Sequence, residues 1–272
     1  MRMPMIICLV LLAALMLFAA SGTGALRQPP AAPQTGFLFR EVTADGIAMK
    51  YAVYVPRHYT PDKQWPAIVF LHGSGECGTD GQKMIIQGIG RNILWNADRW
   101  PCIVLFPQNP GAPRGSQGAN REQSLAMRSW TRCDAAVMKM LEETRAAYSI
   151  DPDRIALTGL SLGGHGAWSI GAAHPDVWCA IAPICGFADA PGGFAPPETI
   201  AAKLKDVPMW IFHGDADDVV SPDHSRNVAA AMKAAGARDV RLTIYPGVNH
   251  VSWDKAYEEA ELPAFLMQTK KR

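Results

Sequence analysis

A serine between two glycines is the feature of this sequence with the clearest chemical potential. Residues 159–163 read Gly-Leu-Ser-Leu-Gly, which places Ser161 in a G-x-S-x-G pattern. That pattern is typical of a nucleophile elbow, a sharp turn from strand to helix that exposes a serine hydroxyl. A serine in such a strained turn crowds the residues two before and two after it, and glycine removes the side chains that would clash. We therefore predict that Ser161 is a nucleophile.

The residues around the serine predict a strand before it and a helix after it. Residues 154–158 are largely apolar, and residues 164–173 are rich in glycine and alanine. A helix that starts at the serine points its free N–H groups and the positive end of its dipole at the serine oxygen. We expect the backbone N–H of Leu162 to donate to the oxyanion that forms on a substrate.

A base for this serine has to come from one of seven histidines. A serine hydroxyl is a poor nucleophile without a general base, and the base needs a carboxylate that fixes its tautomer. His72 and His213 end predicted strands beside glycines, where we expect packing and hydrogen bonds within turns. His250 lies in a loop after the last predicted strand, the place of the base in the chain order serine, acid, histidine. We predict that His250 is the base.

The acid has to come from the segment 213–220, which reads His-Gly-Asp-Ala-Asp-Asp-Val-Val. Its candidate acids are Asp215, Asp217 and Asp218. Spacing alone leaves all three open. Loop carboxylates also suit calcium, but no EF-hand-like spacing is present, so we predict no metal site.

A glycine-rich loop after the first predicted core strand offers further contacts for a substrate. It reads His-Gly-Ser-Gly over residues 72–75. In elbow enzymes the second oxyanion donor comes from such a loop, and we expect the N–H of Ser74 to fill that role. Gly75 is the next candidate donor and a predicted substrate contact. Trp130 and Trp253 are candidate walls of an acyl or aryl pocket, with ordinary packing as the alternative for each.

The elements that position these residues alternate between strand and helix patterns from residue 65 to the end of the chain. Continuous apolar runs that end in glycine or proline, as at 65–72 and 101–107, are typical of central parallel strands. The alternation predicts an α/β fold with a mostly parallel sheet flanked by helices, and ligands bind at the carboxyl ends of such strands. The other predicted strands are 37–40, 49–56, 154–158, 178–184, 207–213 and 240–245, and the predicted helices are 84–95, 133–148, 164–173, 225–235 and one from Trp253. We expect turns at 45–46 and 151–153, and a loop at 186–199.

The stretch between the strands 178–184 and 207–213 is short for this fold. An inserted lid domain would need a longer stretch. We expect a loop there, no lid domain and therefore an open cleft, which disfavours long-chain triglycerides as substrates.

Several segments resemble α/β hydrolases. The tail H-G-x-x-D-x-x-V resembles that of prolyl-oligopeptidase, dienelactone-hydrolase and carboxylesterase-type enzymes, and the resemblance implies that Asp217 is the triad acid, with Asp218 as the alternative. FLHGSGECGTDG and IDPDRIALTGLSLGGHGAW resemble the bacterial predicted-peptidase and esterase group, which is itself similar to phospholipase/carboxylesterases. The similarity runs from about Phe37 to the last helix and implies the α/β-hydrolase fold. Cys77 departs from the basic or polar residue expected there.

The composition fits one globular catalytic domain. The chain has 272 residues, of which 49% are hydrophobic and 19% charged, and its formal net charge is +1. This is enough for one large core, and it provides no strong field that would attract nucleic acid. We predict a single domain over 37–272, preceded by a proline-rich linker over 26–36.

The first residues have the pattern of a secretory signal. Arg2 precedes an apolar run over 5–20, and small residues follow over 21–25. We predict a signal peptide over 1–25 and a secreted or periplasmic protein without membrane contact after cleavage; an uncleaved anchor is the alternative.

Six cysteines occur, and Cys8 lies in the predicted signal. The others are Cys77, Cys102, Cys133, Cys179 and Cys185. The last two lie along one predicted strand and are too far apart to pair with each other. Buried thiols and disulfides both remain open, since an exported protein can oxidise its cysteines.

These inferences predict a secreted serine hydrolase that cleaves carboxylic esters through an acyl-enzyme and needs no cofactor. Its partner would be a small-molecule or polysaccharide-linked ester. A small-peptide hydrolase of the same fold and a non-catalytic binding module are the alternatives, and the oligomeric state is left open.

Overall fold

The structure is a computed structural model and describes residues 33–112, 126–188 and 195–271. Residues Pro33–Arg272 group into one compact unit. The predicted signal peptide and the predicted linker up to residue 32 lie outside the described residues. Within the described ranges, no helix combines the length and apolarity that a membrane crossing requires.

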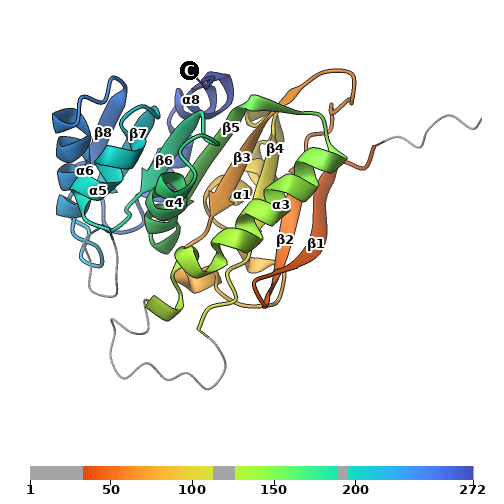
Figure 1. The fold of residues 1–272 in the computed structure, drawn as a ribbon, viewed down its shortest axis with the longest axis horizontal. Helices are drawn as coiled ribbons and strands as arrows, with labels where there is room; N and C mark the ends of the chain where they lie inside the picture. Colours follow the sequence, from red (N-terminus) through yellow and green to blue (C-terminus); the bar gives the residue numbers. More distant parts are fainter. Residues whose placement is uncertain (1–32, 113–125, 189–194, 272) are drawn as a thin grey trace, which may run out of the picture. The chain divides into compact units, whose positions relative to one another are not determined.

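An eight-stranded sheet forms the centre of this unit, in the order β1-β2-β4-β3-β5-β6-β7-β8 (Figure 1). The strands are β1 Gly36–Ala44, β2 Ile47–Val55, β3 Trp65–Leu71, β4 Ile103–Pro107, β5 Ile150–Leu160, β6 Ala180–Ile184, β7 Met209–Gly214 and β8 Val240–Tyr245. The β1–β2 hairpin is antiparallel and joins β4 antiparallel, whereas all the other neighbours run parallel. The carboxyl ends of β3 to β8 therefore meet at one edge of the sheet.

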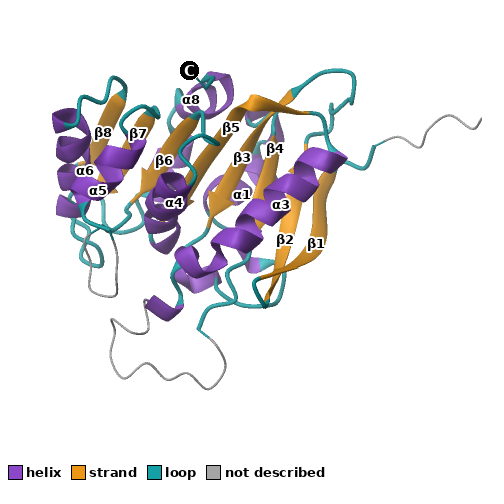
Figure 2. Cartoon of the chain, viewed as in Figure 1, coloured by secondary structure: helices purple, strands orange, loops and turns teal. Residues whose placement is uncertain are grey.

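Helices cover both faces of the sheet and create two hydrophobic clusters (Figures 1 and 2). The residues of β3 alternate between them, since Val69 and Leu71 belong to one cluster and Ile68 and Phe70 to the other. The first cluster includes residues of α3 Asp134–Ala147, α4 Leu162–Ala173, α5 Pro197–Leu204 and α6 Asp223–Ala234. The second includes residues of α1 Gly88–Trp95, α7 Trp253–Glu258 and α8 Leu262–Gln268. A sheet covered on both faces explains why its strands read as continuous apolar runs.

The predicted α/β architecture is confirmed. The turn expected at 45–46 is present, and both Asp45 and Gly46 have positive φ, as a tight turn between twisted strands requires. All eight predicted strands occur, and the helix after the elbow ends at Ala173, directly before His174-Pro175. The described part of 185–208 contains α5 and loop, without a lid domain.

Four predicted features differ from the structure. The helix expected over 84–95 is a short 3₁₀ turn, Lys83–Ile85, followed by α1, which begins at Gly88. The turn expected at 151–153 lies inside β5, where the pairing with β3 shifts register and Asp151 accepts a hydrogen bond from Asp153 N–H at 3.0 Å. Helix α5 begins inside the predicted loop 186–199. The predicted final helix is two helices, because the chain turns at 259–261 and Pro263 lies in the first turn of α8, where proline is tolerated.

The backbones of α4 and β3 touch at Gly163. A Cβ atom at this position would overlap the carbonyl oxygen of Leu71 and approach that of His72, closer than any real Cβ contact. Gly159 is equally restricted, because a Cβ there would overlap the carbonyl oxygen of Gly163. The two glycines therefore allow the close packing of α4 on the strand ends.

Gly163→Ala is expected to destabilise the fold by about 3 kcal/mol, the upper end of the usual cost of overpacking, because the added methyl group has only rigid backbone to displace. Urea unfolding measures the change. Gly75→Ala is the control, since nothing lies within 4 Å of a Cβ at that position. Equal stability of the two variants would contradict the close approach.

Candidate active site

Ser161 lies on the turn between β5 and α4. Its φ is 53° and its ψ is −115°, a strained conformation for a residue with a side chain. Hydrogen bonds hold the turn on both sides: Ser161 N–H donates to the carbonyl of Ile184 at 2.9 Å, and His165 N–H donates to the carbonyl of Ser161 at 3.0 Å. The predicted strained turn is therefore present in the backbone.

The loops after β7 and β8 are braced against each other. Ala216 N–H donates to the carbonyl of Val248 at 3.0 Å, and Gly247 N–H donates to Asp215 Oδ1 at 2.6 Å. A Cβ at Gly214 would overlap the Val248 carbonyl, so this approach also requires glycine. The brace brings together the loop that carries Asp217 and the loop that carries His250.

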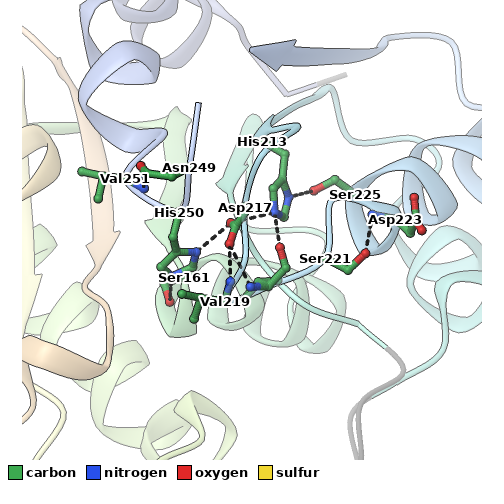
Figure 3. A network of polar contacts seen from close by, with 11 residues as sticks. Ser161, His213, Asp217, Val219, Ser221, Asp223, Ser225, Asn249, His250 and Val251 are labelled. Atoms are coloured by element: carbon green, nitrogen blue, oxygen red, sulfur yellow. Dashed lines mark hydrogen bonds and ion pairs between the residues drawn. The ribbon is translucent and has the colours of Figure 1, made fainter. Parts of the chain in front are cut away.

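Three of the predicted residues form one hydrogen-bonded series (Figure 3). His250 Nε2 lies 2.9 Å from Ser161 Oγ, and His250 Nδ1 lies 2.7 Å from Asp217 Oδ2. A carboxylate only accepts, so Nδ1 carries the proton and Nε2 is free to accept from the serine hydroxyl. This is the geometry in which a serine can lose its proton to an imidazole.

The carboxylate of Asp217 is enclosed and held by several donors. Its side chain has 0% exposure, and Oδ1 accepts from the N–H groups of Val219 and Val220, both at 2.9 Å. Burial alone would raise the pKa of Asp217. The hydrogen bonds from Val220 N–H, His250 and Val219 N–H more than offset burial and hold this pKa below its usual value. The carboxyl group of Asp217 is therefore ionised at neutral pH. The neighbouring Asp218, in contrast to buried Asp217, is exposed to solvent.

His213 also contacts this carboxylate, which the sequence interpretation did not foresee. Its Nε2 lies 3.1 Å from Asp217 Oδ2 and 3.0 Å from the carbonyl of Val220, and its Nδ1 lies 2.7 Å from Ser225 Oγ (Figure 3). The predicted role in packing and turn bonding is correct but incomplete. The sequence signal that could have indicated this contact is the position of His213 at a strand end, four residues before Asp217.

The loop that carries Ser74 lies beside Ser161. A Cβ at Gly73 would lie 3.6 Å from the Cβ of Ser161. The buried ring of His72 fixes this loop, because its Nδ1 donates to the Gly73 carbonyl at 2.7 Å and its Nε2 accepts from Asn109 N–H at 3.0 Å. Ser74 opens a short 3₁₀ turn, Ser74–Glu76, next to the serine.

The predicted pocket residues lie in different environments. Trp130 is fully buried, and its Nε1 donates to the carbonyl of His72 at 3.2 Å. The expectation that it lines an open pocket is therefore not supported, because its ring packs between the loop and Gly166 and has no exposed surface. Trp253 is partly exposed and packs edge-to-face on His250, with ring centroids 5.4 Å apart. Gly75 is exposed.

One group of potential metal ligands occurs among the described residues, and it overlaps the series. Single ligand atoms of Cys185, Asp217 and His250 lie within 4.8 Å of one another. Two of these side chains are hydrogen-bonded to each other, and burial raises the pKa of the Cys185 thiol, so sulfur is present as a thiol rather than a thiolate. Hydrogen bonding accounts for the cluster without an ion.

The cysteines at 77, 102, 133, 179 and 185 are all free thiols in the structure. Four of them are buried, and Cys77 is partly buried. Burial raises the pKa of Cys77 to about 11 and that of Cys133 to about 12, which makes these thiols poor nucleophiles.

Comparison with known proteins places the chain in a family. Residues 96–261 match the family described as "Dienelactone hydrolase family". The chain belongs to the dienelactone hydrolase family. This confirms the predicted relation to α/β hydrolases. The matched range contains Ser161, Asp217 and His250.

Relatives of this dienelactone hydrolase family member include esterases of several kinds. Acyl-protein thioesterase 1 of Debaryomyces hansenii is 22% identical over 71% of this chain and 88% of its own length. Feruloyl esterase B of Neurospora crassa is 28% identical over 60% of this chain and 64% of its own length. A thermostable esterase of known structure has a TM-score of 0.70 and 29% identity, and the match covers 86% of this chain and 63% of that esterase. The chain thus spans less than two thirds of the last two relatives.

Two buried histidines are expected to stay neutral in mildly acidic solution. Burial lowers the pKa of His72 and that of His165 to about 4. In an NMR titration their ring C–H resonances should not move between pH 8 and about 5.5, whereas an exposed histidine titrates near 6.5.

The His72→Gln variant identifies the His72 resonance by its loss. Because the folded protein keeps both rings neutral, the unfolded chain binds more protons as the pH falls from about 6.5 to about 4, so the free energy of unfolding decreases over that range. Movement of all seven resonances near pH 6.5 would contradict this expectation.

Proposed function

We propose that this protein is a serine hydrolase that cleaves carboxylic esters. The observation that carries the proposal is the hydrogen-bonded series from Asp217 through His250 to Ser161. Membership of the dienelactone hydrolase family and similarity to a feruloyl esterase and a thermostable esterase support ester cleavage. A non-catalytic binding module would not need such a hydrogen-bonded series, so its presence favours an enzyme over that alternative.

In the proposed acylation step, Ser161 Oγ attacks the carbonyl carbon of the ester while its proton passes to His250 Nε2. Asp217 stabilises the imidazolium that forms and keeps the ring oriented. The C–O bond to the alcohol then breaks, and His250 returns the proton to the leaving oxygen. The product is an acyl-enzyme, from which a water molecule, activated by the same histidine, releases the acid.

The proposed oxyanion hole consists of two backbone donors. Leu162 is the first residue of α4, so its N–H lies at a helix N-terminus, where the helix dipole stabilises the negative charge of an oxyanion. The N–H of Ser74 lies in the loop whose Gly73 approaches Ser161. One such donor typically contributes about 10²–10³ in rate.

The proposed substrates are small-molecule or polysaccharide-linked esters. The described part of the segment between β6 and β7 contains only α5 and loop, and the absence of a lid domain among these residues supports access for bulky substrates. Partly exposed Trp253, packed on His250, would offer an aromatic wall beside the reacting ester.

One observation favours peptide cleavage as a second candidate function. The Glu76 carboxylate lies on the same side of Gly73 as Ser161, because a Cβ at Gly73 would be 3.2 Å from Glu76 Oε2 and 3.6 Å from Ser161 Cβ. Burial raises the pKa of Glu76, and an ammonium group bound beside it would favour the ionised form. A carboxylate beside the serine is a suitable partner for the ammonium group of a short peptide.

Short p-nitrophenyl esters are expected to be hydrolysed and aminoacyl-anilides to be poor substrates. The reason is that an alcohol leaves more readily than an amine. Ser161→Ala should lower kcat/KM for the esters by at least about 10⁴. Ester hydrolysis that survives this substitution would contradict the mechanism, and anilide turnover without ester turnover would favour the peptidase.

Asp217→Asn and Asp218→Asn form a matched pair for the acid. The first is expected to lower kcat by about 10³–10⁴, because an amide does not hold His250 in the required tautomer. The second should leave kcat within about twofold, since Asp218 is exposed. Steady-state kinetics on one ester measure both, and an equal loss in the two variants would contradict the assignment of Asp217.

A further inference from the structure

We propose that His213 is a positioning residue that fixes the carboxylate of Asp217 for His250. The inference rests on the proposed function, because it concerns the acid of the same series. It starts from one observation: two imidazoles contact the same carboxylate oxygen. Asp217 Oδ2 lies 2.7 Å from His250 Nδ1 and 3.1 Å from His213 Nε2 (Figure 3).

The surroundings of His213 determine which nitrogen carries its proton. The side chain has 0% exposure, and burial lowers its pKa, so the ring is neutral. Its Nε2 faces two acceptors, Asp217 Oδ2 and the Val220 carbonyl, whereas its Nδ1 faces the hydroxyl of Ser225, which can donate. The proton therefore lies on Nε2, and the ring donates to the carboxylate.

This donor completes the coordination of the carboxylate by hydrogen bonds. Oδ1 accepts from Val219 N–H and Val220 N–H, and Oδ2 accepts from His250 and His213. A carboxylate has about four acceptor sites, so all of them are occupied. Without the His213 imidazole, Oδ2 would be held by His250 alone. Asp217 could then turn together with the His250 ring that it has to orient.

The neutral state of His213 matters for the chemistry as well as for the packing. A cation at this position would neutralise Asp217 and compete with the imidazolium that forms on His250. A neutral donor holds the oxygen in place and leaves the negative charge of Asp217 available to His250. Ser225 supports this state, because its hydroxyl can donate to Nδ1 at 2.7 Å and leave the ring proton on Nε2.

A purely structural role is the competing interpretation. His213 also links β7 to the loop 217–220 and, through Ser225, to α6. In that case any variant that weakens the link should lose stability and activity together. The two interpretations differ in whether activity depends on the N–H that reaches Asp217.

His213→Gln and His213→Asn separate the two interpretations. The amide of glutamine reaches about as far as Nε2 and can still donate to Asp217, whereas the amide of asparagine reaches only as far as Nδ1. We expect His213→Gln to keep kcat within about fivefold of the wild type and His213→Asn to lower kcat by at least about tenfold. KM should stay within about twofold in both, because the lost interaction acts in the transition state.

Thr144→Val is the stability control. It removes a buried hydroxyl that donates to the Met140 carbonyl at 2.7 Å on α3, outside this network. We expect a lower melting temperature with unchanged kcat. Equal kcat losses in His213→Gln and His213→Asn, a His213→Asn variant with wild-type kcat, or a similar kcat loss in Thr144→Val would overturn the positioning role.

Imidazole ¹⁵N spectra of the wild-type protein provide a readout that needs no variant. We expect His213 to show the neutral tautomer with its proton on Nε2 at pH 7. A charged ring, or a proton on Nδ1, would overturn the inference. The proposed function fails separately: ester hydrolysis that persists in Ser161→Ala would remove the triad itself.

Discussion

The structure depends on one close approach between two backbones. Helix α4 starts directly after Ser161, and Gly163 brings it against the carbonyl of Leu71 at the end of β3. No side chain fits between them, so the serine, the helix N-terminus and the loop after β3 are held at one place on the sheet edge. The electrostatic benefit of the helix end at the serine exists only because this steric condition is met.

The second requirement is that loops from distant parts of the chain meet at that place. Parallel strands bring the ends of β5, β7 and β8 to the same edge, but they leave the loops free to move. The contacts between Asp215 and Gly247 and between Ala216 and Val248 fix two of these loops to each other. Asp217 and His250 therefore approach as parts of one braced unit, and the hydrogen bonds between side chains only complete the arrangement.

The sequence was sufficient for the fold and for most of the series. Ser161 follows from its flanking glycines, and His250 from the chain order serine, acid, histidine. Spacing could not separate Asp217 from its neighbours, since three aspartates lie within four positions, and only the resemblance to α/β hydrolases selected it. Their difference is one of burial, which depends on tertiary packing.

The remaining differences have physical causes that a local pattern does not contain. The register shift in β5 depends on pairing with β3, which is distant in sequence. Trp130 is aromatic, as residues of pocket walls often are, yet it packs under the loop that begins at His72, because Gly166 leaves room for its ring. The contact between His213 and Asp217 needs the turn of the intervening chain, which places residue 217 back over the strand end.

The two cores on opposite faces of the sheet have a consequence for how the protein loses its order. Ser161 is anchored through α4 to one core, whereas His250 precedes α7, which packs in the other core and whose Tyr257 hydroxyl lies 2.9 Å from Thr158 Oγ1 of β5. A slight loosening of the α7 layer would separate the imidazole from the hydroxyl while the sheet stayed intact. Under the proposed mechanism, turnover would then be lost in mild denaturant before the far-ultraviolet signal of the helices and strands changed, because the series needs both layers to stay packed.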